Sequence, residues 1–390
     1  MARRNRTLPR LDRTEEITER ISKLLSSPLQ NIGQALKSEF DFIEHSVRID
    51  AANEDILKIF VSQISAILEI LPDTFGERFW FDAQMIYAIA STWNGNSQRL
   101  SATIIPKPHH EWAHASTFVP SGIGNRERKS INVIFFPGRD TLSDIDLLNY
   151  PWVCHELAHN LFYYDDSLFV DSFNRRLNSF LGSLRLRAIA DHGSARSKSH
   201  ALISHIEEFW APTLTHKNWA HEMAMDIVAL WTCGPSFLAA FQDEIEDETK
   251  NPYLVDKVHP PYAVRAIALL KAGKALGWQE HTQKIRGILE HWRKSKSAKQ
   301  VDNSYLALSE PLLTEGVVAC AQATCHSLSL PKCTPTEIER IKGLLVHDEI
   351  PDFGVDLIIA AWLVREQEDE ETFSRWETAK IRSRLDSLMQ

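Results

Sequence analysis

Residues 151–162 read PWVCHELAHNLF and contain the series His155-Glu156-Leu157-Ala158-His159. Proline at position 151 suits the first turn of a helix, and the residues around the two histidines are mostly uncharged. On a helix, side chains four residues apart lie on the same face. The stretch therefore predicts a helix that presents both imidazoles on one side.

Two histidines on one helix face are typical of a zinc site. Both imidazoles can bind one Zn²⁺ at about 2.0–2.1 Å, and the glutamate beside the first histidine can reach a water on the metal. A glutamate in that place can act as a general base in hydrolysis. We therefore predict that His155 and His159 are zinc ligands and that Glu156 is the catalytic base.

A third ligand is expected from a second apolar segment, residues 219–230, whose pattern predicts a helix. Glu222 and Asp226 lie four residues apart there and would share a face. Glu222 can then bind zinc, while Asp226 can accept a hydrogen bond from the far nitrogen of a ligand histidine. The competing candidates for the third ligand are Asp165, Glu207 and Glu208.

The sequence contains a second match to the same pattern, His110-Glu111-Trp112-Ala113-His114. Prolines at positions 106, 108 and 120 flank this match. Proline disfavours helix both at its own position and at the residue before it. We therefore do not expect the second match to form the catalytic helix.

A third motif begins at His259-Pro260 and ends at Arg265, at the start of another expected helix. A cation or an N–H donor near zinc can stabilise the negative charge of a tetrahedral intermediate, which is one possible use of His259 and Arg265. The alternative is a proline-initiated helix with a surface arginine. The spacing by itself leaves both open.

Taken in order, the three motifs resemble those of the gluzincin metallopeptidases of the CAAX prenyl endopeptidase and heat-shock protease type, over about residues 131–275. The resemblance implies a zinc site held by His155, His159 and Glu222, with Glu156 as the base and with His259 and Arg265 supporting substrate or oxyanion. Met225 stands where the family usually has alanine before the aspartate. Typical members are also embedded in a membrane, whereas this sequence has no spanning segment.

Composition excludes several classes of protein. The chain has 390 residues with 43 basic and 52 acidic side chains, a net charge of −9 that argues against nucleic acid as the main partner. No apolar run approaches the ~20 residues needed to cross a bilayer, so no membrane partner is expected. Five scattered cysteines are typical of a reducing compartment, which predicts a cytoplasmic protein.

The expected fold is α+β and predominantly α, with a zincin-like catalytic core, a small sheet and helical flanking regions. The short β-prone runs are 102–105, 117–119 and 131–136, and the last could either offer an edge to an extended peptide or be buried because it is apolar. The predicted regions are a helical N-terminal region (1–100), a catalytic region (101–292) and a helical C-terminal region (301–390).

These features together predict a zinc metalloendopeptidase that acts on a protein or peptide. One alternative is a catalytically inactive scaffold with a zincin-like site, and another is a zinc hydrolase of a small amide. Cys320, Cys325, His326 and Cys333 lie close together in the sequence, but their spacing matches no standard pair of zinc knuckles. We expect these cysteines to be buried thiols rather than a second metal site.

Overall fold

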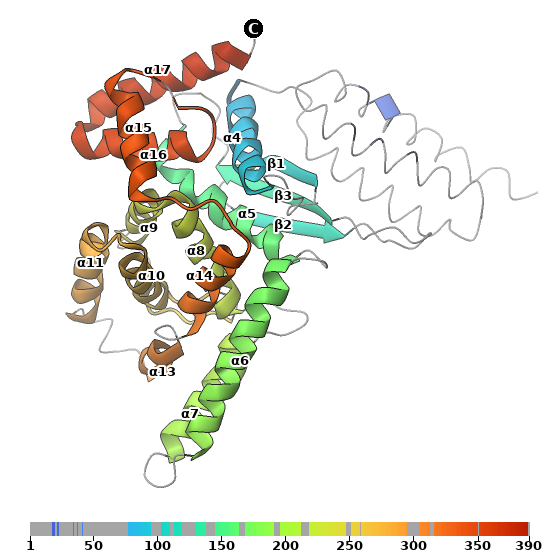
Figure 1. Ribbon diagram of the computed structural model, residues 1–390, viewed down its shortest axis with the longest axis vertical. Coiled ribbons are helices and arrows are strands. Elements are labelled where there is room, and N and C mark those ends of the chain that lie inside the picture. Colours follow the sequence, from blue (N-terminus) through green and yellow to red (C-terminus); the bar gives the residue numbers. More distant parts are fainter. Residues whose placement is uncertain are drawn as a thin grey trace, which may run out of the picture. The chain divides into compact units, whose positions relative to one another are not determined.

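The computed structural model of the chain (Figure 1) is described here for residues 18, 19, 22, 34, 37, 41, 77–94, 103–109, 113–118, 130–137, 145–163, 168–190, 196–211, 218–246, 251–257, 259–294, 304–312, 316–349 and 351–388. The chain divides into two compact units. One consists of Met1–Asp82 with Ser101–Arg139, and the other of Ala83–Leu100 with Asp140–Gln390. The division into regions 1–100, 101–292 and 301–390 that the sequence suggested remains a prediction.

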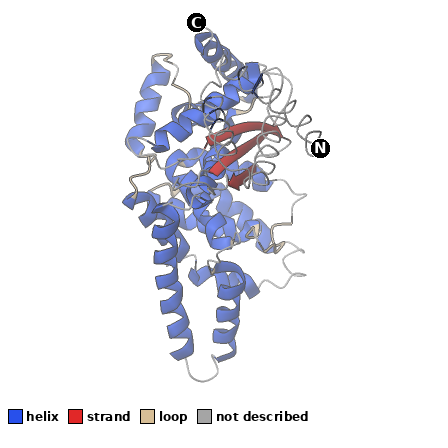
Figure 2. Cartoon of the chain, turned by 90° about the vertical axis from the view of Figure 1, so that its right-hand side faces the viewer, coloured by secondary structure: helices blue, strands red, loops and turns tan. Residues whose placement is uncertain are grey.

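Helices make up the second unit as far as its residues are described (Figure 2). Helix α4 (Glu77–Asn94) contributes its larger part to this unit. The following helices are η4 (Leu147–Asn149), α5 (Pro151–Tyr163), α6 (Leu168–Ala190), α7 (Arg196–His205), η5 (Ile206–Trp210), α8 (Trp219–Cys233), α9 (Pro235–Glu246), α10 (Tyr262–Leu276), η6 (Glu280–Thr282), α11 (Gln283–Lys294), α13 (Ser304–Leu312), α14 (Val318–Ser327), α15 (Pro335–Val346), α16 (Val355–Gln367) and α17 (Glu370–Leu388).

The first unit contains three paired strands, β1 (Thr103–His109), β2 (Ala113–Phe118) and β3 (Ser130–Pro137). Their order is β1-β3-β2, with β3 parallel to β1 and antiparallel to β2. Both edges of β3 are therefore paired. Of the two possibilities for residues 131–136, an edge open to a peptide is wrong, because this run forms the central strand.

The second His-Glu-x-x-His match falls at the end of β1 and the start of β2, two strands that each pair with β3. Strand β1 ends at His109 and β2 begins at Ala113, so His114 lies on a strand. Residues 110–112 lie outside the described part of the chain. The expectation that this match does not form a catalytic helix is confirmed.

The expectation of an α+β fold is wrong, because the chain is mostly α. The β-prone runs pair with one another in the first unit, whereas the helix that carries His155 belongs to the second. Packing in the second unit is helix against helix, as its largest fully buried side chains on helices show: Trp93, Trp210, Trp219, Phe169, Phe173, Phe237 and Phe241. A β-prone run predicts strand pairing but not whether the sheet belongs to the main core.

Helix α8 is the central element of this core, and of its residues only His221 is not buried. The helix begins at an Asn218 cap whose side-chain oxygen accepts the His221 N–H at 3.0 Å. It ends at Gly234, whose φ of +58° suits glycine. Pro235 then starts α9, as expected for a proline that cannot continue the preceding helix.

Helix α5 packs against α8 through small and apolar side chains. Cys154 on α5 and Cys233 on α8 are fully buried, with their sulfur atoms 3.2 Å apart. Leu157 and Ala158 are also fully buried on α5. This close packing fixes the position of the two histidines relative to the acidic residues of α8.

All five cysteines are buried and carry free thiols. Among the described residues, none of the helices combines the length and the apolar character that crossing a membrane requires.

Candidate metal centre

The two histidines of the first motif lie on one face of α5, as the sequence predicts. Both side chains are buried, and the ring centroids of His155 and His159 are 5.1 Å apart at an interplanar angle of 82°. Pro151 at the first position of α5 and the turn Leu147–Asn149 before it set where this helix begins. The helix thus presents two imidazoles to the same point in space.

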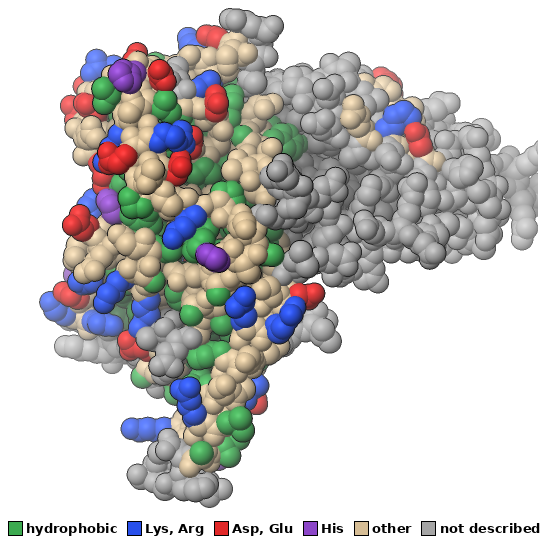
Figure 3. All heavy atoms as spheres, viewed as in Figure 1, with side chains coloured by type: hydrophobic (Ala, Val, Ile, Leu, Met, Phe, Trp, Pro, Cys, Tyr) green, Lys and Arg blue, Asp and Glu red, His purple; other side chains and the backbone are tan. Residues whose placement is uncertain are grey.

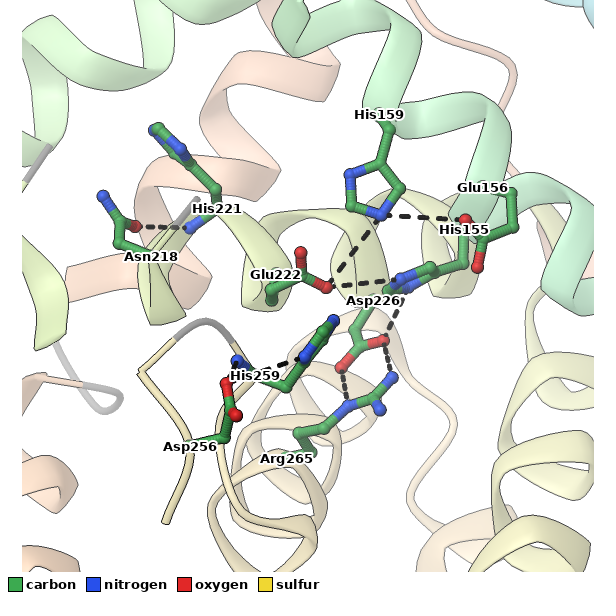
Figure 4. A network of polar contacts seen from close by, with 10 residues as sticks. All are labelled: His155, Glu156, His159, Asn218, His221, Glu222, Asp226, Asp256, His259 and Arg265. Atoms are coloured by element: carbon green, nitrogen blue, oxygen red, sulfur yellow. Dashed lines mark hydrogen bonds and ion pairs between the residues drawn. The ribbon is translucent and has the colours of Figure 1, made fainter. Parts of the chain in front are cut away.

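Glu222 reaches the same point from α8 (Figure 4). Its Oε2 atom lies 3.6 Å from Nε2 of His155 and 3.9 Å from Nε2 of His159. Ligand atoms bound tetrahedrally to one zinc at 2.0–2.2 Å are separated by about 3.4 Å. Two imidazole nitrogens and one carboxylate oxygen form a donor set that suits a catalytic zinc with one open position. The residues therefore fit the metal.

Glu156 lies beside this donor set and is also buried. Its Oε2 atom is 3.8 Å from Nε2 of His159. One ligand atom each from His155, Glu156 and His159 lies within 4.8 Å of the others. Glu156 and Glu222 are thus both close to the imidazoles but belong to different helices, which allows one carboxylate to hold a metal and the other to transfer protons.

Asp226 lies one turn after Glu222 and orients His155. Its Oδ1 atom is 2.9 Å from Nδ1 of His155. A neutral His155 then donates its Nδ1–H to Asp226 and leaves Nε2 directed at Glu222 and available to a metal. The contact predicted from the Glu-x-x-x-Asp spacing is present.

Arg265 holds Asp226 from the other side. Its Nε donates to Oδ2 at 2.9 Å and its Nη2 to Oδ1 at 2.7 Å. Burial raises the pKa of the Asp226 carboxyl, but Arg265 and His155 outweigh that effect and lower the pKa to about 2. Asp226 is therefore ionised at neutral pH although it is fully buried.

The pKa of His155 reflects the same contacts. Burial lowers it, but the hydrogen bonds to Asp226 and Glu222 outweigh burial and raise the pKa to about 9. Without a metal, His155 is thus protonated at neutral pH. A divalent cation on Nε2 would replace the proton there and face the Glu222 carboxylate, while Nδ1–H still donates to Asp226.

Three aromatic rings enclose the Arg265 guanidinium. Its Cζ atom lies 5.4 Å from the ring centroid of Trp152, 5.5 Å from that of Phe241 and 5.7 Å from that of Tyr262. Trp152 also contacts His155 edge to face, with centroids 5.6 Å apart. Sequence reasoning missed these three rings, although the position of Trp152 three residues before His155 on the same helix was a usable signal.

His259 is exposed to solvent, unlike the buried residues His155 and Asp226. Its side chain is 63% exposed, and its backbone N–H donates to Oδ1 of Asp256 at 3.0 Å. The loop is fixed to α8, because Trp219 Nε1 donates to the carbonyl of Asp256 at 2.7 Å. The structure therefore brings Arg265 into contact with the Glu222–Asp226 helix, whereas His259 is exposed on an anchored loop nearby (Figure 4).

The other candidates for ligands are placed differently. Asp165 lies outside the described residues, and Glu207 and Glu208 are exposed on η5. Within the described part of the chain, no cluster of potential ligand side chains stands apart from this centre, since the group close enough together for a metal contains His155, Glu156 and His159. Cys320, Cys325 and Cys333 are buried, as expected of thiols that pack in a core.

Comparison with known proteins adds one partial similarity. No family model matches the chain, and no solved structure matches it. A phosphoribosylaminoimidazole-succinocarboxamide synthase from Exiguobacterium sp. is 30% identical over 124 residues, which are 30% of this chain and 45% of the synthase. The chain thus matches less than half the length of that enzyme, which does not establish a family.

Proposed function

We propose that this protein is a zinc-dependent metallopeptidase of the gluzincin type that hydrolyses peptide bonds in a protein substrate. The observation that carries the proposal is the position of Glu222. Its Oε2 lies 3.6 and 3.9 Å from the Nε2 atoms of His155 and His159, which come from another helix. Two imidazoles and a carboxylate with a second glutamate beside them are the residue types of a hydrolytic zinc site.

In the proposed reaction Glu156 transfers one proton, and no covalent bond forms between the protein and the substrate. A zinc held by His155, His159 and Glu222 would supply a Lewis acid for the scissile carbonyl and would lower the pKa of a bound water to about 7. Glu156 accepts a proton from the attacking water as the oxygen–carbon bond forms. Glu156 then delivers that proton to the departing amine nitrogen as the carbon–nitrogen bond breaks.

Asp226 and Arg265 are positioning residues in this proposal. Asp226 accepts the Nδ1–H of His155 and so selects the tautomer whose Nε2 lone pair can bind a metal. Arg265 keeps Asp226 ionised and fixed through two hydrogen bonds. Because both are made with Asp226, Arg265 acts on the site through that residue, and the exposed His259 is the better placed of the two for contact with substrate.

The proposal includes a cytoplasmic location and a protein or peptide partner. Five free, buried thiols favour a reducing compartment. The reaction is tested with both a protein and a small amide, which separates a peptidase from a hydrolase of small amides.

The test is hydrolysis of fluorescently labelled casein by zinc-loaded wild-type protein, by Glu156→Gln and by Glu207→Gln. Glu156→Gln should lower the rate by about 10²- to 10⁴-fold, since it removes the base. Glu207→Gln, which changes an exposed carboxylate, should leave the rate unchanged. Wild-type rates in Glu156→Gln would refute the role of Glu156.

Wild-type protein that binds zinc but cleaves neither casein nor a small amide would support the inactive scaffold instead. Cleavage of a small amide without cleavage of casein would support the small-amide hydrolase. In both cases the peptidase proposal would be wrong.

A further inference from the structure

Helices α6 and α7 form an arm, defined as residues 168–190 with 196–205. The two helices lie side by side and extend away from the other helices of their unit (Figures 1 and 2). One face of α6 is buried through Phe169, Phe173, Leu177, Leu181 and Ala188. The opposite face of the same helix is open to solvent.

The arm is basic in a chain that is acidic. Between positions 168 and 205 the acidic residues are Asp171 and Asp191, and the basic residues are Arg175, Arg176, Arg185, Arg187, Arg196 and Lys198. The whole chain carries a net charge of −9. Figure 3 shows Lys and Arg side chains along the elongated lower part of the molecule, where α6 and α7 lie. Such a local positive field attracts an anionic surface.

A shallow hollow of about 560 Å³ lies along α6, beside the point where Phe180 packs against Gly316. Arg175, Arg176 and Arg187 line it together with Ser179, Phe180 and Ser183. Guanidinium groups and hydroxyls donate hydrogen bonds that suit phosphate oxygens. The hollow therefore has the chemistry of a site for a phosphate head group.

Two large apolar side chains that lie near Arg187 in the sequence are exposed on α6. Leu186 is 69% exposed and Ile189 is 62% exposed. Being three residues apart on α6, they project toward the same side. Exposed apolar side chains interleaved with arginines are typical of helices that lie in the interface of a bilayer, where the apolar groups enter the acyl boundary.

We propose that the open face of the arm is a docking surface for an anionic phospholipid bilayer. Arg175, Arg176 and Arg187 would contact lipid phosphates, and Leu186 and Ile189 would enter the interface. Single-stranded nucleic acid fits less well, because binding it relies on exposed aromatic rings. In the described residues of the arm, Phe169 and Phe173 are buried, and Phe180 packs against Gly316.

The experiment is sedimentation of the full-length protein with two kinds of vesicle, phosphatidylcholine alone and phosphatidylcholine with about one third phosphatidylserine. One variant, Arg175→Gln with Arg187→Gln, removes charge from the arm, and another, Leu186→Ser with Ile189→Ser, removes its apolar contact. The matched controls are Lys274→Gln with Arg286→Gln, which are exposed on α10 and α11, and Val346→Ser, which is 80% exposed on α15.

We expect binding to the anionic vesicles alone, weakened roughly tenfold or more by the arginine pair and several-fold by the apolar pair. Binding should fall as salt rises, and both controls should bind like wild type. All substituted side chains are exposed, so circular dichroism should show unchanged melting.

Three results would overturn the proposal. The first is equal or absent binding to the two kinds of vesicle, and the second is a loss of binding in the controls as large as in the arm variants. The third is binding of the arm to polyglutamate, to RNA or to a second copy of the chain without binding to vesicles, which would assign the surface to that partner instead. None of these results bears on the metal centre, which is tested separately.

Discussion

Arg265 donates a hydrogen bond to each carboxylate oxygen of Asp226, at 2.9 Å from Nε to Oδ2 and at 2.7 Å from Nη2 to Oδ1. The same carboxylate lies 2.9 Å from Nδ1 of His155. One buried aspartate thus links an arginine of α10 to a histidine of α5. The orientation of a predicted zinc ligand therefore depends on a residue that does not itself face the metal position.

Asp226→Asn should weaken zinc binding by about 10- to 100-fold, because the amide is neutral and no longer fixes the tautomer of His155 as firmly. The measurement is competition for zinc with a chromogenic chelator. Asp356→Asn provides a control, since it changes an exposed aspartate that also pairs with an arginine, Arg340. Equal zinc affinity in wild type and Asp226→Asn would contradict the assigned role of Asp226.

Arg265→Gln should destabilise the fold by about 3–5 kcal/mol, because it leaves the Asp226 charge buried without its cation. Arg340→Gln should cost less than about 1 kcal/mol, because its ion pair is exposed to solvent. Urea unfolding of the two variants gives the comparison. Similar losses in both would show that the Arg265–Asp226 pair contributes no more than a surface pair.

Glu377 makes the stability of the folded state depend on pH. Burial raises its pKa to about 8, although the N–H of Leu147, 2.6 Å from its Oε1, lowers it. The folded state therefore holds this proton more tightly than the unfolded state. Stability is greatest below the ordinary glutamate pKa and falls as pH rises toward about 8, by at most about 1.4 kcal/mol per pH unit.

Glu377→Gln should remove this part of the pH dependence, because the amide oxygen can still accept the Leu147 N–H and carries no charge. Thermal melting from mildly acidic to mildly alkaline pH checks the prediction. Glu370→Gln, which changes an exposed residue of the same helix, should leave the profile as in wild type. Identical pH profiles for Glu377→Gln and wild type would contradict it.

Gly234→Ala should destabilise the protein by about 1–3 kcal/mol. The backbone has φ of +58° there, and a Cβ would lie 2.6 Å from the Cys333 sulfur. Gly287→Ala on α11 should instead stabilise by about 0.5–1 kcal/mol, because a Cβ there meets nothing within 4 Å and alanine favours helix. Urea unfolding distinguishes the two, and a neutral Gly234→Ala would contradict the steric argument.

Local spacing accounts for most of what the sequence predicted at the site. His155 and His159, and likewise Glu222 and Asp226, are each four residues apart on one helix, so the 3.6-residue period places each pair on one face. The bond from Arg265 to Asp226 spans 39 residues and depends on how α10 packs on α8. No local pattern carries that information, so the sequence suggested a substrate contact where the structure has an ion pair.

The prediction of an α+β fold was wrong for a related reason. The apolar β-branched run at residues 131–136 correctly predicts a strand, because period and side-chain type are local properties. Whether that strand joins the core around α8 or pairs in another unit is decided by contacts distant in sequence. The same limit explains why the run looked like an exposed edge but forms the middle strand.

The most direct test of the metal centre is the zinc content per chain, measured by inductively coupled plasma mass spectrometry on purified wild-type protein, Glu222→Ala and Asp165→Ala. We predict about one zinc in wild type and in Asp165→Ala and almost none in Glu222→Ala, because a catalytic zinc has three protein ligands and cannot spare one. One zinc per chain in Glu222→Ala, or none in the wild type, would contradict a site built from His155, His159 and Glu222.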